Sequence, residues 1–356
     1  MFSANASHDK LKFVGQLKGY EAVRSGGAGL IDLTQRGRIR VGGSEAVMFL
    51  NGLITNDMKT LLAKSWMPAV FPNVQGRLIA SVRVLRLTDE NEKNPIFILD
   101  TEPTTHQAVL KTIERFTLAG DFRVIDVTAD TMMFSVQGRS AAAIVEQVLN
   151  VPAANLPANG LSETTFNGAN LTLIRATHSS EDGFDLIIDA EHGAELLKAM
   201  IDAGAVLVGD ETAEVLRIEA GIARFGQDMD ESNVVSETNL DDAVSFTKGC
   251  YIGQEIIVRI KHRGHVAKKL TGLFIESDAV ETGSVIKSTE GKEIGRITSA
   301  TFSPQLNKAI SLGYIRYEFL APGTDVVVGE GAVPAKVTEV PFVSGSWTEL
   351  SRDHHD

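Results

Sequence analysis

The amino-acid sequence predicts an α+β protein of more than one domain, with a small all-β domain toward its C-terminal end. The chain has 356 residues, which is longer than one compact core usually is. Up to Leu270, apparent strands and helices follow one another without strict alternation, which favours α+β over a doubly wound sheet. After Leu270 helical periodicity disappears, and short apolar runs separated by Gly, Pro and Asn predict a β-barrel.

The elements before the barrel follow from periodicity. Alternating apolar and polar residues predict strands at residues 30–41, 78–87, 95–100, 132–136, 171–176 and 184–189. Ser44 can cap a helix whose apolar face carries Val47, Leu50 and Ile54. Helical spacing of apolar residues predicts further helices at residues 104–119, 140–149, 194–203 and 211–223. Residues 156–170 are rich in Asn, Gly, Pro, Ser and Thr, which predicts a loop.

Five apolar runs predict strands of the barrel, at residues 273–275, 294–297, 309–314, 325–328 and 335–340.

Composition and charge exclude several classes of protein. The net charge of −12 argues against non-specific nucleic-acid binding, and we expect no direct contact with nucleic acid. No apolar run approaches the roughly 20 residues that span a bilayer, and residues 1–15 do not resemble a signal peptide. A single cysteine excludes an internal disulfide or a self-contained zinc or iron–sulfur cage, so we expect a reducing cytoplasm and no metal site.

The single cysteine, Cys250, is the first candidate for chemistry. Gly249 precedes it and Gly253 follows, and glycines allow tight bends and close approach by a ligand. Lys248 lies two residues before it, and a nearby cation stabilises the reactive thiolate. A lone cysteine is more often a buried small hydrophobe, so these residues alone leave a nucleophile, a metal-ligating thiolate and a packing residue open.

A basic stretch follows the cysteine in this acidic chain, formed by Arg259, Lys261, Arg263, Lys268 and Lys269. Such a run is usually a solvated surface. Next to a glycine-punctuated cysteine, it also predicts a surface that attracts an anionic ligand or partner.

The segment from Lys248 to Glu255, with Arg259 and Gly264 after it, resembles the Lys-Gly-Cys-Tyr/Phe-x-Gly-Gln-Glu signature of the YgfZ family. The motif residues are Lys248, Gly249, Cys250, Tyr251, Gly253, Gln254 and Glu255. The family comprises folate-binding relatives of the glycine cleavage T-protein that are linked to assembly or repair of iron–sulfur enzymes. The resemblance implies a folate-binding protein that acts through Cys250, with Lys248 beside it.

The resemblance covers residues 28–343 and implies a fold and its boundaries. Residues 216–221 and 225–231 are similar to T-protein segments, and so are 49–57 and 294–304. The implied fold has a ferredoxin-like α+β unit and a C-terminal β-barrel around a central folate channel. We expect an N-terminal extension at 1–27, a folate-binding region of two intertwined α+β subdomains at 28–270, the barrel at 271–345 and a tail at 346–356.

Two folate contacts follow from the resemblance. Glu181 stands where the T-protein holds the pterin ring with a glutamate, and a carboxylate accepts the paired donors of an amino-pyrimidine. Arg217 aligns with an arginine near the bound folate. Glu181 as a simple turn carboxylate, and Arg217 as a salt-bridge partner of Glu219 or another carboxylate, remain open as structural alternatives.

The chain departs from the T-protein where that enzyme has its catalytic aspartate. Ala80 and Ser81 stand there, and neither carries a carboxylate. The Tyr-Thr pair before the pterin glutamate is also replaced, by residues 178–180. These departures disfavour the aminomethyl transfer of the T-protein.

Three functions follow. The first is a monomeric, tetrahydrofolate-binding accessory protein for iron–sulfur enzymes or their assembly proteins, tRNA-modifying enzymes included. The second is a folate-dependent aminomethyltransferase or methyltransferase of the T-protein type. The third is an interaction module that has lost both ligand and chemistry.

Overall fold

The computed structural model of the chain describes residues 17–352, apart from residues 90–91, 116, 118–119 and 278–279. The chain divides into two compact units, each built from segments that are distant in sequence. Unit 1 holds the chain up to Gln35, residues 129–220 and the chain from Ser344; unit 2 holds residues 36–128 and 221–343. Within the described residues, no helix combines the length and the apolar character needed to cross a membrane.

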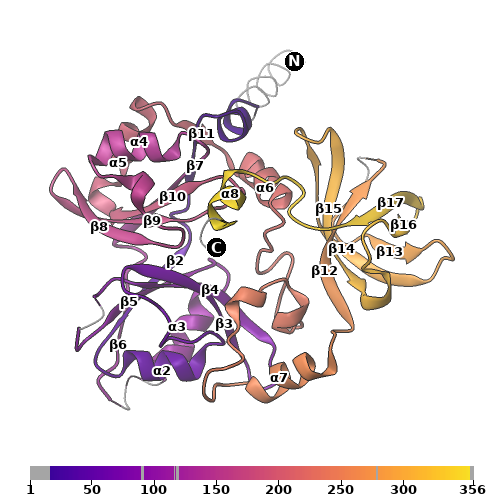
Figure 1. The fold of residues 1–356 in the computed structure, drawn as a ribbon, viewed down its shortest axis with the longest axis horizontal. Coiled ribbons are helices and arrows are strands. Elements are labelled where there is room, and N and C mark those ends of the chain that lie inside the picture. The colour runs from indigo at the N-terminus through magenta and orange to yellow at the C-terminus, as the bar shows by residue number, and fades with distance from the viewer. Residues whose placement is uncertain (1–16, 90–91, 116, 118–119, 278–279, 353–356) are drawn as a thin grey trace, which may run out of the picture. The chain divides into compact units, whose positions relative to one another are not determined.

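Unit 1 is built on a six-stranded sheet in the order β11-β1-β7-β10-β9-β8 (Figure 1). Its strands are β1 (Gly29–Asp32), β7 (Thr131–Gln137), β8 (Leu161–Phe166), β9 (Ala169–Arg175), β10 (Gly183–Asp189) and β11 (Val206–Val208). β1 and β11 pair in parallel, and the other neighbours are antiparallel.

Helices supply the apolar partners of both faces of this sheet. Helices α4 (Ala141–Leu149) and α5 (Ala190–Asp202) share a core with Leu30. Helix α6 (Asp210–Glu219) and the helical residues 17–24 share a second cluster with Ile31. Leu30 and Ile31 are neighbours on β1, so the alternation of a strand sends them to opposite faces. Helix α8 (Ser346–Arg352) and the short η1 (Ala153–Asn155) complete the unit.

Unit 2 begins with a five-stranded antiparallel sheet in the order β3-β4-β5-β2-β6. Its strands are β2 (Gly37–Gly42), β3 (Ser65–Pro72), β4 (Leu78–Arg86), β5 (Ile96–Thr101) and β6 (Arg123–Asp126). Helices α2 (Ala46–Leu53) and α3 (His106–Glu114) pack their apolar residues into its core. The fully buried Asp100 is paired with Arg36 at 2.7 Å and Arg83 at 2.6 Å. Burial would raise the pKa of Asp100, but the two guanidinium groups lower it overall.

A closed six-stranded barrel forms the C-terminal part of unit 2, in the order β12-β15-β14-β13-β16-β17. Its strands are β12 (Lys268–Ile275), β13 (Val285–Ser288), β14 (Glu293–Ser303), β15 (Lys308–Arg316), β16 (Asp325–Val328) and β17 (Val333–Thr338). Before it come η2 (Val235–Glu237), η3 (Asp241–Ala243) and helix α7 (Gln254–Arg263), and η4 (Tyr317–Phe319) follows β15.

The structure confirms the predicted α+β class and the C-terminal barrel. The loop predicted at residues 156–170 is wrong, because Leu161–Phe166 is strand β8 and pairs with β9. The turn between them is Asn167-Gly168, and both residues have positive φ, as a tight hairpin requires. Helix α7 was not predicted at all. The domain boundaries proposed from sequence stay a prediction, since the two units group packed elements and not family domains.

Candidate functional site

The motif around Cys250 forms an irregular turn that leads into α7. Cys250 and Gly249 are exposed, whereas Lys248 and Tyr251 on either side of them are buried. The backbone of the turn is held in place by Ile252, whose amide donates to the carbonyl of Gly52 at the end of α2, 3.1 Å away. The buried neighbours therefore anchor the turn, and the thiol projects to the surface.

Lys248 is held by backbone carbonyls. Its Nζ donates to the carbonyl oxygens of Asn51 at 2.7 Å, Ile54 at 3.0 Å and Asn56 at 2.6 Å. An ammonium has three donors and no acceptor, so these contacts use all of its N–H groups. Burial lowers the pKa of Lys248 to about 8, while the charge of Asp57 acts in the opposite direction. Lys248 therefore has no N–H left to donate to the thiol.

Two further motif residues, Tyr251 and Gly253, have structural roles. The Tyr251 ring packs in a small core, and the Lys248 ammonium lies 5.0 Å from its centroid. Gly253 has φ +75° directly before α7, and a Cβ there would approach the carbonyl oxygen of Asn73 to 2.3 Å. Any other residue at position 253 would be strained and would push away the β3–β4 turn.

The remaining motif residues lie on α7. Gln254 is half-buried, whereas Glu255 and Arg259 are exposed. Two lysines of the basic stretch have contacts of their own: Lys261 lies 4.4 Å from the centroid of the Phe246 ring, and Lys269 pairs with Asp241 at 3.3 Å. Lys268 lies against the barrel residue Tyr314.

Glu181 lies in unit 1 and is buried. Its Oε2 accepts hydrogen bonds from the amide of Ser346 at 2.9 Å and from the Ser346 hydroxyl at 2.7 Å. Its Oε1 accepts from Arg24 at 3.3 Å. A Cβ on the preceding Gly345 would approach the Glu181 side chain to 2.6 Å, so the backbone there lies directly against the carboxylate.

Arg217 is also in unit 1, on α6, and its guanidinium pairs with Glu214 at 2.6 Å. Glu219, the partner considered from sequence, accepts hydrogen bonds from Arg24 at 2.7 Å and from the Tyr20 hydroxyl at 2.6 Å. Arg24 thus joins the carboxylates of Glu181 and Glu219.

Sequence reasoning missed Arg24, Tyr20 and Ser346, which lie in segments assigned to an extension and a tail. Arg24 lies 157 residues from Glu181 along the chain, and Ser346 lies 165 residues from it. The only available signal was the helical spacing of Tyr20 and Val23, both of which are buried.

The position of the missing aspartate lies on β4. Ala80 is fully buried in the core of the unit 2 sheet, and its neighbour Ser81 is half-buried. Glu181 has the chemistry to bind an amino-pyrimidine, but Ser346 and Arg24 already use its oxygens, so a pterin would have to displace Ser346. Among the described residues, no group of three or more His, Cys, Asp or Glu side chains is arranged to hold a metal ion.

Comparisons with known proteins agree with this fold. The chain is 27% identical over 343 residues to an aminomethyltransferase of Nostoc sp., covering 94% of this chain and 90% of the relative. It is also 27% identical to a putative chloroplastic transferase of Arabidopsis thaliana, covering 89% of this chain and 72% of that one.

Among solved structures, the chain resembles the glycine cleavage system aminomethyltransferase T of Bartonella henselae. The TM-score is 0.84 at 23% identity, and the match covers 92% of this chain and 90% of that one, which shows a shared fold. The family model of the GCVT N-terminal domain matches residues 7–248, and that of the glycine cleavage T-protein C-terminal barrel domain matches residues 268–344. This chain therefore belongs to the glycine cleavage T-protein family.

Proposed function

We propose that this protein binds tetrahydrofolate or a folate derivative and takes part in folate-dependent transfer of an aminomethyl or methyl group. The observation that supports this most is the similarity, along nearly the whole chain, to relatives named aminomethyltransferase. This reverses the order of functions that the sequence motif alone favours, since those relatives are named aminomethyltransferase.

Glu181 is the residue we propose for recognition of the ligand. Its carboxylate is buried, and the adjacent N–H groups of an amino-pyrimidine could pair with its two oxygens once Ser346 leaves Oε2. Arg24 lies 3.3 Å from that carboxylate and pairs with it. A bound folate would supply the nitrogen that accepts the one-carbon group.

Such a transfer needs a carboxylate other than one at positions 80 and 81. Neither Ala80 nor Ser81 carries one, so the group that would take this role is a separate question for mutagenesis.

A second function is supported by a separate observation. Cys250 is an exposed thiol on an anchored turn, and the T-protein aspartate is absent. An accessory role toward iron–sulfur enzymes or their assembly proteins, through transient ligation or attack by the Cys250 thiolate, uses both features.

An assay with purified protein, tetrahydrofolate and an aminomethyl donor separates the two functions. If the protein is a transferase, 5,10-methylenetetrahydrofolate accumulates catalytically, Glu181→Gln lowers the rate, and Cys250→Ser does not. Without turnover, the transferase proposal fails. The accessory proposal predicts that Cys250→Ser fails to restore iron–sulfur enzyme activity in a deletion strain, and full restoration contradicts it.

A further inference from the structure

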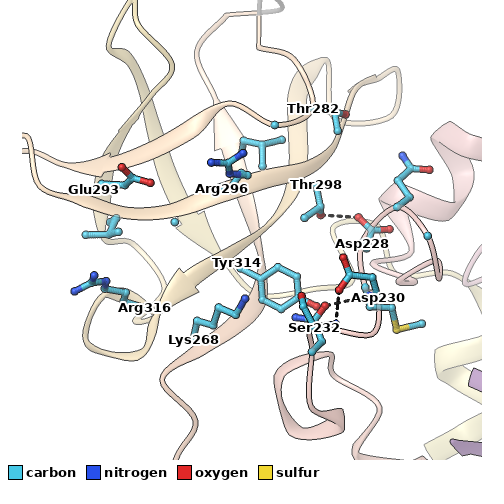
Figure 2. A pocket seen from close by; sticks show the side chains of 18 residues that line it. Asp228, Asp230, Ser232, Lys268, Thr282, Glu293, Arg296, Thr298, Tyr314 and Arg316 are labelled. Atoms are coloured by element: carbon cyan, nitrogen blue, oxygen red, sulfur yellow. Dashed lines mark hydrogen bonds between the residues drawn. The ribbon is translucent and has the colours of Figure 1, made fainter. Parts of the chain in front are cut away.

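A cavity of about 640 Å³ lies beside the barrel in unit 2, and none of its lining residues belongs to the cysteine motif (Figure 2). One wall is the segment Gly226–Asn233, and the other is formed by β12, β14 and β15. Ile315 lies in the barrel core, so the neighbouring Tyr314 points to the outer face, toward the cavity. Cavities of this volume are typical of small-molecule sites.

The barrel wall carries three cations, Lys268, Arg296 and Arg316, and one carboxylate, that of Glu293 at the start of β14. Strand register sets Arg296 opposite Tyr314 and Lys268 opposite Arg316. Tyr314 and Arg316 are two residues apart on β15, so they share a face. The Lys268 ammonium lies 4.8 Å from the centroid of the Tyr314 ring. Figure 2 shows Lys268 beside the Tyr314 ring, with Arg296 and Arg316 on the same wall of the cavity.

The opposite wall carries two carboxylates. Asp228 is buried and accepts hydrogen bonds from the hydroxyls of Thr298 and Ser299, each at 2.6 Å. Asp230 is exposed and accepts from the amide of Ser232 at 2.7 Å. Hydrogen bonds from Ser232 lower the pKa of Asp230, and the charge of Lys268 contributes to this, so Asp230 is ionised at neutral pH.

The Tyr314 hydroxyl lies where the two walls meet. The residue is 7% exposed, and its hydroxyl has no hydrogen-bond partner within the described part of the chain. A buried hydroxyl left unpaired costs about 1–3 kcal/mol, and such groups usually have a partner. Burial raises the pKa of Tyr314, and Glu237, Asp228 and Asp230 raise it further, so the hydroxyl keeps its proton.

These charges select the kind of molecule that fits. A simple anion would meet the basic wall but would also face Asp228 and Asp230. A simple cation would meet the carboxylates but would also face Lys268 and Arg296. A molecule with an anionic end and an amine end satisfies both walls and gives the Tyr314 hydroxyl a partner.

We propose that this cavity binds an amphoteric small molecule, whose carboxylate or phosphate end lies against Lys268 and Arg296 and whose amine end lies against Asp230, with the Tyr314 hydroxyl bonded to it. The site is separate from the folate proposal: its residues differ, and its failure would leave that proposal intact.

Calorimetric titration of the full chain tests this. The probes are ω-amino acids from glycine to 6-aminohexanoate and 2-aminoethyl phosphate. The comparators are the matching monocarboxylates, inorganic phosphate and alkylamines, which each lack one end. We expect at least one amphoteric probe to bind about tenfold more tightly than both of its comparators. A preference for the aminocarboxylate or for the aminophosphate identifies the anionic end and supports the proposal in either case.

Variants add the second arm of the test. Tyr314→Phe keeps the ring, and Lys268→Met keeps most of the stem, so both should fold, which circular dichroism checks. Each should weaken the best probe about tenfold through the lost polar contact. Lys287 is a half-buried lysine on the barrel strand β13, outside the cavity, and Lys287→Met should leave binding unchanged. Equal binding of amphoteric probes and comparators, or unchanged binding by Tyr314→Phe, overturns the proposal.

Discussion

Ser346 donates both its amide and its hydroxyl to the same oxygen of Glu181, at 2.9 and 2.7 Å. The C-terminal segment of unit 1 therefore satisfies the carboxylate that we propose for the pterin ring. A ligand and Ser346 would compete for that oxygen.

Ser346→Ala removes one of the two donors and should make the carboxylate more accessible to tetrahydrofolate. Since a hydrogen bond to a charged group contributes about 1.5–3 kcal/mol, the Kd should fall about tenfold. Isothermal titration calorimetry measures it, with Glu349→Gln, an exposed change on the same helix, as the control. An unchanged or higher Kd for Ser346→Ala would mean that Ser346 does not compete.

Lys248→Met should destabilise unit 2, because three backbone carbonyls lose their shared donor. The free energy of unfolding should fall by about 3 kcal/mol in urea titrations. Lys248→Arg should not restore it, since a planar guanidinium does not match a cage built for a compact ammonium. The exposed Lys261→Met is the control, with a change below about 0.5 kcal/mol. A wild-type-like Lys248→Met would contradict a structural role for this ammonium.

Tyr251→Phe should reduce the loss of stability at alkaline pH. Burial raises the pKa of Tyr251 from 10.0 to about 12, and its hydroxyl has no hydrogen-bond partner among the described residues. Between these two values the unfolded chain has released the phenolic proton while the folded chain retains it, so the free energy of unfolding falls as pH rises.

The measurement is the free energy of unfolding at several pH values from neutral to about 12. Tyr251→Phe should be close to wild type at neutral pH and should fall less steeply above pH 10.0. Tyr317→Phe, at a residue 48% exposed, is the control. Parallel curves for Tyr251→Phe and wild type would rule out this titration.

Cys250→Ser should change the free energy of unfolding by less than about 0.5 kcal/mol, because the thiol is exposed and makes no packing contribution. In the native wild-type protein, a disulfide reagent such as Ellman's should titrate this one thiol at a rate close to that in denaturant. Strong protection of the native thiol would contradict its position on the surface of the turn.

The barrel could be predicted from the sequence, since short apolar runs between glycines and prolines mark its strands. Only its strand β13 was not predicted. Helix α7 was missed because left-handed glycines bound it at both ends and its ten residues include many charged ones. The motif identified Lys248, Cys250 and Tyr251, but the orientation of the Lys248 side chain depends on carbonyls nearly two hundred residues away in sequence, such as that of Asn51 at a separation of 197. Ser346 on Glu181 is equally non-local. Local periodicity carries no information on such contacts.

Folate recognition by Glu181 is the central claim, and titration of tetrahydrofolate into wild type and Glu181→Gln tests it most directly. Glu195→Gln, an exposed carboxylate of the same unit that accepts from Asn167, is the matched control. We expect saturable binding by wild type and control, and binding weaker by about tenfold or more in Glu181→Gln, through loss of a charged acceptor. Absence of binding by the wild type, or equal affinity of wild type and Glu181→Gln, would contradict the claim.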